Sequence, residues 1–97
     1  MNIGQFKATL VDDKHDLTWP PLLQAMWWDA KGDWHRAHEV AQEIETSLGS
    51  LVHAYLHRKE GDLGNAQYWY RRANRPVFEG SLEAEWELIV LESIDEF

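Results

Sequence analysis

Histidines in the middle of the chain could bind a metal ion or transfer protons. The sequence has five histidines, and four of them lie at positions 35, 38, 53 and 57. His53 and His57 are four residues apart, so on a helix both imidazoles project from one face and can reach a single ion. Together with His35 or His38 they would form a histidine-centred metal-binding or small catalytic site.

Packing is the simpler interpretation of the same histidines. Asp33, Glu39 and Glu60 could add oxygen ligands, but no His-Glu-x-x-His motif supplies a catalytic carboxylate. Buried polar side chains normally find hydrogen-bond partners, so His53 and His57 are predicted to be partly buried packing residues. We therefore predict no metal and no cofactor, and we favour a protein that is not an enzyme.

Large aromatic side chains form the second group of candidates. Trp27 and Trp28 are adjacent, and so are the three rings at positions 68–70. Neighbours on a helix point about 100° apart, so these rings cannot all enter one core. Some are expected to pack against the terminal segments, and others could line a groove or a homodimer interface. The side chains expected to contact a protein or peptide partner are Trp28, His53, His57, Arg58, Trp69 and Arg72.

The charge is uneven along the chain. The formal net charge is −8, and residues 76–97 contain seven acidic residues and no basic one. Nucleic acids and anionic membranes are attracted by clustered positive charge, so neither is an expected partner. The one local basic group consists of Arg58, Lys59, Arg71, Arg72 and Arg75.

Two roles are open for the acidic C-terminal segment. Its glutamates could pair with the basic group and occupy a surface that otherwise binds an acidic peptide. The simpler role is a solvated face on a capping helix, because exposed ion pairs contribute only about 0–1 kcal/mol each. The glutamates are Glu83, Glu85, Glu87 and Glu92.

Several other chemistries have no support in the sequence. There is no cysteine, which excludes thiolate zinc sites and cysteine nucleophiles. The serines read as helix caps or surface residues, and no Gly-x-x-x-x-Gly-Lys loop occurs. The first residues lack a basic segment followed by an apolar stretch, so we expect a cytoplasmic protein.

A repeated Gly-Asp pair indicates how these residues are positioned. Gly32-Asp33 is echoed 29 residues later by Gly61-Asp62, with an apolar residue and an alanine at matching positions after each. Glycine can adopt the left-handed conformation that ends one helix, and aspartate can cap the next. Each copy is therefore predicted to be a helix hairpin.

The resulting prediction is one all-α domain over residues 1–97, with about five helices. Hairpin 1 covers residues 20–48 and hairpin 2 covers residues 50–76, with Gly49 breaking the chain and Ser50 as a cap. Residues 81–96 form an amphipathic capping helix over the open end of the stack. Residues 1–19 are irregular or form a short helix that covers the other end.

Residues 55–73 resemble a tetratricopeptide repeat and are similar to the related Sel1-like repeats. The match rests on Gly61-Asp62 and on the small–large–small positions Ala66, Tyr70 and Ala73. The copies are 29 residues apart, whereas that family repeats about every 34 residues. His53 and His57 also stand where the family has apolar core residues.

The resemblance implies an α-α superhelix of two hairpins that binds peptides or proteins in a groove. The longer stretch of residues 31–73 also looks like a family of small uncharacterised proteins, which implies no function. A fold of this kind fixes no activity, so the expected function is a helical-repeat scaffold for protein or peptide interaction.

Overall fold

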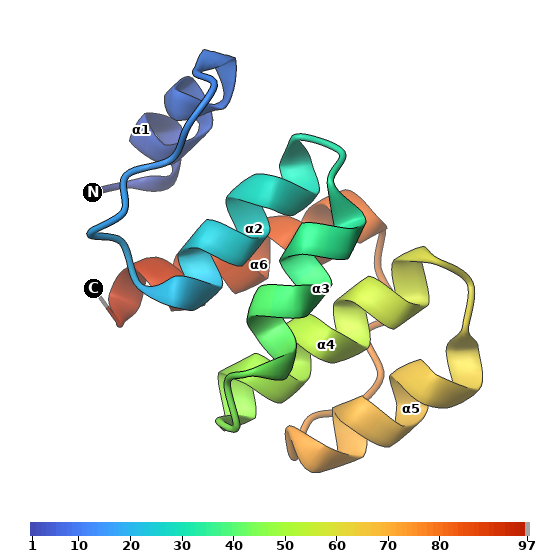
Figure 1. Cartoon of the computed structure of the whole chain (residues 1–97). Helices are drawn as coiled ribbons and strands as arrows, with labels where there is room; N and C mark the ends of the chain where they lie inside the picture. Colours follow the sequence, from blue (N-terminus) through green and yellow to red (C-terminus); the bar gives the residue numbers. More distant parts are fainter. Residues whose placement is uncertain (97) are drawn as a thin grey trace.

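The computed structural model describes residues 1–96, and this part of the chain is all helical with no strand. The helices are α1 (Ile3–Ala8), α2 (Pro21–Ala30), α3 (Trp34–Gln42), α4 (Ser47–Lys59), α5 (Leu63–Arg72) and α6 (Leu82–Asp95), with a 3-10 turn at Thr9–Val11. Figure 1 shows α2 and α3 side by side, then α4 and α5, with α6 behind α2; α6 also contacts α4. The all-α prediction is confirmed. The helices number six because residues 3–8 form one.

The two Gly-Asp pairs make the turns that the sequence predicts. Gly32 and Gly61 have φ angles of 86° and 89°, which are left-handed and favour glycine. Asp33 accepts a hydrogen bond from the backbone N–H of Arg36, and Asp62 accepts one from Asn65. Each pair therefore ends one helix and caps the next, so that consecutive helices pack antiparallel.

The predicted break at Gly49 is wrong. Helix α4 begins two residues earlier, at Ser47, and Thr46 caps it by accepting a hydrogen bond from the backbone N–H of Gly49. A Cβ on Gly49 would lie 2.1 Å from the carbonyl oxygen of Ile44. Glycine is needed here because the α3–α4 connection passes close to the helix, and the expected boundary between residues 48 and 50 falls inside α4.

Helix α6 does not close the end of a stack beyond α5. It packs across α2 and α4, and its buried Ile89 and Val90 complete the core that Met26 and Trp27 begin. The indole N–H of Trp86 donates to the carbonyl oxygen of Met26. This position buries the apolar stripe of α6 against α2 and α4.

The N-terminal segment lies on the same side as α6 and does not cover the opposite end. Phe6 of α1 is fully buried, with its ring 5.3 Å from that of Trp19 and 5.9 Å from that of Trp86. Lys7 pairs with Glu87 of α6. The expectation of one terminal segment at each end is therefore wrong.

Two buried carboxylates fix α4 against its neighbours. Asp29 of α2 accepts hydrogen bonds from the Tyr55 hydroxyl at 2.6 Å and from Lys59 at 2.9 Å. Glu85 of α6 accepts them from the Tyr70 hydroxyl at 2.5 Å and from Arg58 at 2.9 Å. Burial, reinforced by the adjacent carboxylate, raises the pKa of each tyrosine, so both hydroxyls stay protonated donors.

Within residues 1–96, no helix is long and apolar enough to cross a membrane.

Candidate functional site

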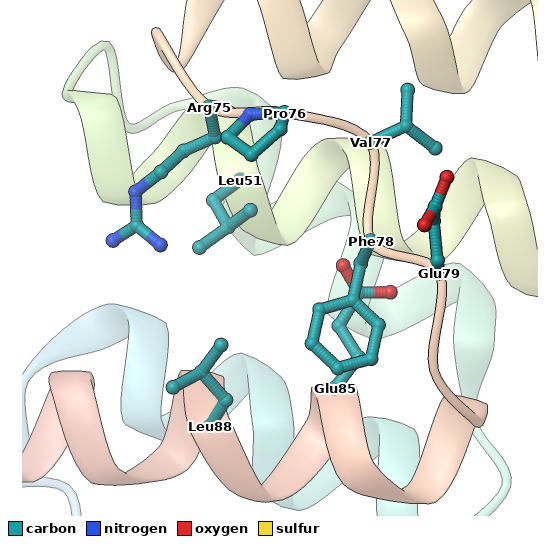
Figure 2. A pocket seen from close by; sticks show the side chains of 8 residues that line it. All are labelled: Leu51, Arg75, Pro76, Val77, Phe78, Glu79, Glu85 and Leu88. Carbon is teal, nitrogen blue, oxygen red and sulfur yellow. The ribbon is translucent and has the colours of Figure 1, made fainter.

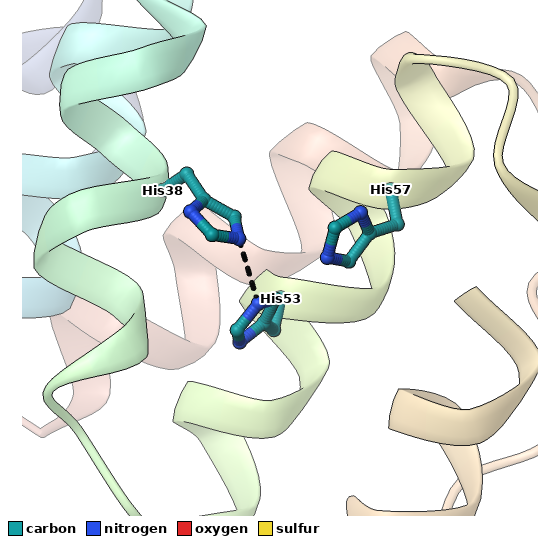
Figure 3. Close-up of side chains that lie close together, drawn as sticks. All are labelled: His38, His53 and His57. Carbon is teal, nitrogen blue, oxygen red and sulfur yellow. Dashed lines mark hydrogen bonds between the residues drawn. The ribbon is translucent and has the colours of Figure 1, made fainter. Parts of the chain in front are cut away.

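Three histidines from two helices converge beside α4. His38 lies on α3, and His53 and His57 lie on α4, with the three rings turned toward one another (Figure 3). One nitrogen from each ring lies within 4.8 Å of the other two, and Nε2 of His38 is 2.8 Å from Nε2 of His53. Nitrogens this close can share a proton or bind one metal ion. We call these three residues the histidine cluster.

The histidine cluster has features of both interpretations made from the sequence, a metal site and buried packing residues. His53 and His57 are 6% and 7% exposed and hydrogen bonded, as the packing interpretation predicts. His38 is half-buried, so the cluster also reaches the surface. His35 is exposed and its imidazole lies 3.4 Å from Glu39 instead. Of the two α3 histidines considered, only His38 faces α4.

The outer nitrogen of His57 is held by a carboxylate. Its Nδ1 lies 2.7 Å from Oε1 of Glu60, a distance at which the ring N–H donates to the carboxylate. That bond leaves Nε2 as the nitrogen that carries the lone pair, facing the cluster. Nδ2 of Asn65, at the start of α5, lies 3.4 Å from this Nε2. A carboxylate behind a histidine is the usual arrangement that orients metal-binding imidazoles.

Two tryptophans form the walls of the cluster. The indole of Trp69 on α5 stacks on His53 with centroids 3.9 Å apart, and that of Trp34 on α3 stacks on His38 at 4.9 Å. Trp34 is itself anchored, because its indole N–H donates to the carbonyl oxygen of Leu56 at 2.8 Å. The imidazole planes are therefore fixed by packing as well as by hydrogen bonds.

The surroundings keep the rings of His38 and His53 neutral. Burial, followed by the neighbouring rings of His38 and His57 and then the charge of Arg72, lowers the pKa of His53 to about 4. Burial and then His57 also lower the pKa of His38. At neutral pH both imidazoles therefore carry a lone pair, which is the form that binds metal ions.

The lowered pKa of His53 predicts acid sensitivity. Below about pH 6.5 the unfolded chain takes up a proton that folded His53 does not accept until about pH 4. This difference in proton uptake at His53 should lower the free energy of unfolding by roughly 1–3 kcal/mol from pH 7 to pH 4. Urea unfolding at several pH values measures this change in the free energy of unfolding. His53→Gln should make the free energy of unfolding less dependent on pH, and His35→Gln should not. An equal dependence on pH in the wild type and in His53→Gln would contradict the lowered pKa of His53.

The predicted partner-contacting residues do not share one face. Trp69 and Arg72 lie beside His53 and His57, where the guanidinium of Arg72 is 5.1 Å from the Trp69 ring centroid. Trp28 lies elsewhere, with the guanidinium of Arg36 4.2 Å above its ring. Arg58 points to the other side of α4, where it binds Glu85. The structure therefore does not bring the six residues into one site.

The acidic face of α6 meets the basic group only in part. Arg58 pairs with Glu85, and Arg75 pairs with Glu92. Among residues 1–96, Arg71 and Arg72 have no carboxylate within ion-pair distance. Helix α6 therefore leaves Arg72, which lies beside Trp69 at the histidine cluster, without a carboxylate partner.

A hollow of about 500 Å³ lies on the other side of α4, between α4, the α5–α6 connection and α6. Figure 2 shows Phe78 and Glu85 side by side in it, with Leu51 and Leu88 as apolar walls. The Glu85 carboxylate is already bound by Tyr70 and Arg58. Arg75, which also lines the hollow, pairs with Glu92, so two of its three charged side chains are already engaged.

Sequence reasoning did not single out Asn65 or Trp34 as part of this site. The signal for Asn65 was the Gly-Asp turn, because a tight turn brings the first turn of α5 beside the last turn of α4, where His57 lies.

No protein-family model, curated protein or solved structure matches the chain. The candidate function therefore follows from the geometry of the cluster.

Proposed function

We propose that this protein binds a divalent transition-metal ion of the zinc class through Nε2 of His38, His53 and His57. The observation that supports the proposal is the convergence of the three ring nitrogens within 4.8 Å. Tetrahedral zinc with bonds of about 2.0–2.1 Å places its ligand nitrogens about 3.3 Å apart. The nitrogens of His38 and His53 are 2.8 Å apart and the other two pairs lie within 4.8 Å, so the rings must shift to bring all three pairs to that spacing.

The kind of donor atom narrows the choice of metal. Imidazole nitrogen suits zinc, copper, nickel and iron, whereas magnesium and calcium prefer oxygen. Glu60 behind His57 supplies the outer carboxylate that raises the basicity of a metal-binding imidazole. Three protein ligands leave one position of a tetrahedral ion open to an external ligand.

A thermal-shift measurement tests the proposal. Zinc at about 100 times its Kd should add about 2.7 kcal/mol to the unfolding free energy, a rise in Tm on the order of 10 °C for a domain of this size. Magnesium should give no rise. Calorimetric titration should show one zinc ion per chain.

Matched variants locate the ion. His53→Ala should abolish the zinc-dependent rise, measured against the metal-free Tm of the same variant so that lost packing does not count. His35→Ala should keep the rise, because that exposed side chain lies outside the cluster. Absence of a zinc-dependent rise in the wild type would reject the proposal.

A second candidate function is a scaffold for a protein or peptide partner, built from two tetratricopeptide-like helix pairs. The observation that favours it is the half-buried pair Trp34 and Trp69 on the face that α6 does not cover, with exposed Tyr68 and Arg72 beside it. Aromatic residues and arginine are the types enriched where proteins bind one another. The same face would serve a homodimer.

A further inference from the structure

An arginine lies beside the tryptophan that forms one wall of the histidine cluster. Nη1 of Arg72 lies 3.1 Å from the hydroxyl oxygen of Tyr68, and its guanidinium is 5.1 Å from the ring centroid of Trp69. Trp69 in turn stacks on His53. In the part of the chain that the structure describes, no carboxylate pairs with Arg72. The arginine and the histidine cluster therefore share one wall.

Positive charge would accumulate at this place. Three neutral imidazoles leave a divalent ion with its full charge, and Arg72 adds another. Glu60 and Asp62 keep their negative charges beside the site, but Oε1 of Glu60 accepts from His57 and Oδ1 of Asp62 accepts from the backbone N–H of Asn65. An anion from outside that binds the open position of the ion would neutralise more of this charge and accept hydrogen bonds from Arg72.

We propose that a carboxylate group completes the coordination of the metal and is held by Arg72. This inference rests on the proposed metal site. Carboxylate oxygens bind zinc at about 2.0–2.2 Å, and the planar guanidinium matches a planar carboxylate. The carboxylate belongs either to a small organic acid or to an Asp or Glu side chain of an acidic partner segment, and the two sources share this chemistry.

Asn65 supplies a second donor for the same group. Its Nδ2 lies 3.4 Å from Nε2 of His57, the nitrogen that the metal would occupy. When the ion binds, the amide N–H loses that acceptor. A carboxylate oxygen on the metal replaces it, so the bound anion satisfies the side chain that the metal displaces.

Cobalt(II) makes the experiment direct, because its visible absorption reports on the ligands of the ion. The full-length protein is loaded with cobalt and titrated with acetate, with a Glu-rich peptide whose C-terminus is amidated, and with the matching Gln peptide. Acetate or the Glu peptide should change the spectrum, and the Gln peptide should not. Arg72→Gln should weaken carboxylate binding about tenfold. Arg71→Gln, which removes the same charge from the neighbouring position, should leave it unchanged.

Each outcome decides one point. No cobalt spectrum at all would reject the metal site itself. A normal cobalt spectrum that neither carboxylate changes, or equal affinities for wild type and Arg72→Gln, would reject only the carboxylate proposal. Tighter binding of inorganic phosphate than of either carboxylate would also overturn it. Stronger binding of the Glu peptide than of acetate would support the proposal with a protein partner as the source, and the reverse would support it with a small acid.

Discussion

Replacing Glu85 by alanine is expected to lower the free energy of unfolding by roughly 3–5 kcal/mol. Glu85 is 1% exposed, and its carboxylate accepts hydrogen bonds from both Arg58 and the Tyr70 hydroxyl. Removing it leaves a cation and a hydroxyl without their acceptor near the core, and unsatisfied buried groups of this kind account for the largest effects of single substitutions. Urea unfolding followed by circular dichroism measures the change.

A neighbouring glutamate provides the control. Glu87 lies on the same helix and pairs with Lys7, but both side chains are about two-fifths exposed. Glu87→Ala should therefore cost less than about 1 kcal/mol. Glu85→Gln, which keeps an acceptor without the charge, should fall between the two alanine variants. Equal losses for Glu85→Ala and Glu87→Ala would show that the buried network does not hold α6 in place.

Deleting residues 81–97 is expected to abolish cooperative folding. Without α6, the core loses Trp86, Ile89 and Val90, and the surface of α2 around Met26 and Trp27 becomes exposed. Domains of this size keep only about 5–15 kcal/mol of net stability, which the loss of a whole buried helix exceeds. Loss of the thermal transition and of the near-ultraviolet signal of the tryptophans would show it.

The same deletion separates the two roles considered for the acidic helix. Glu96→Ala is the control and should keep the full transition, because Glu96 lies on the exposed end beyond α6. A fragment without residues 81–97 that stays folded and gains affinity for acidic peptides would mean that α6 masks a binding surface. We expect the unfolded outcome, because α6 supplies core residues as well as acidic ones.

Local features of the chain could be predicted from sequence because their causes are local. The turns at Gly32-Asp33 and Gly61-Asp62 depend on a left-handed glycine and a capping carboxylate, which neighbouring residues determine. The shared helix face of His53 and His57 follows from their spacing of four residues. Gly49 misled the prediction because its reason is a close approach of Ile44, which no local pattern shows.

The sequence by itself therefore determined the helices, most of their ends, and the pairing of His53 with His57. Only the tertiary structure decided that His38 and not His35 completes the cluster, because these two residues lie on one helix and the crossing of α3 over α4 selects which ring meets the others. It also decided that α6 lies across α2 and α4 and leaves the cluster uncovered. Amphipathic stripes specify which face of a helix is buried, but the packing partner depends on the shapes of all the surfaces that compete for it.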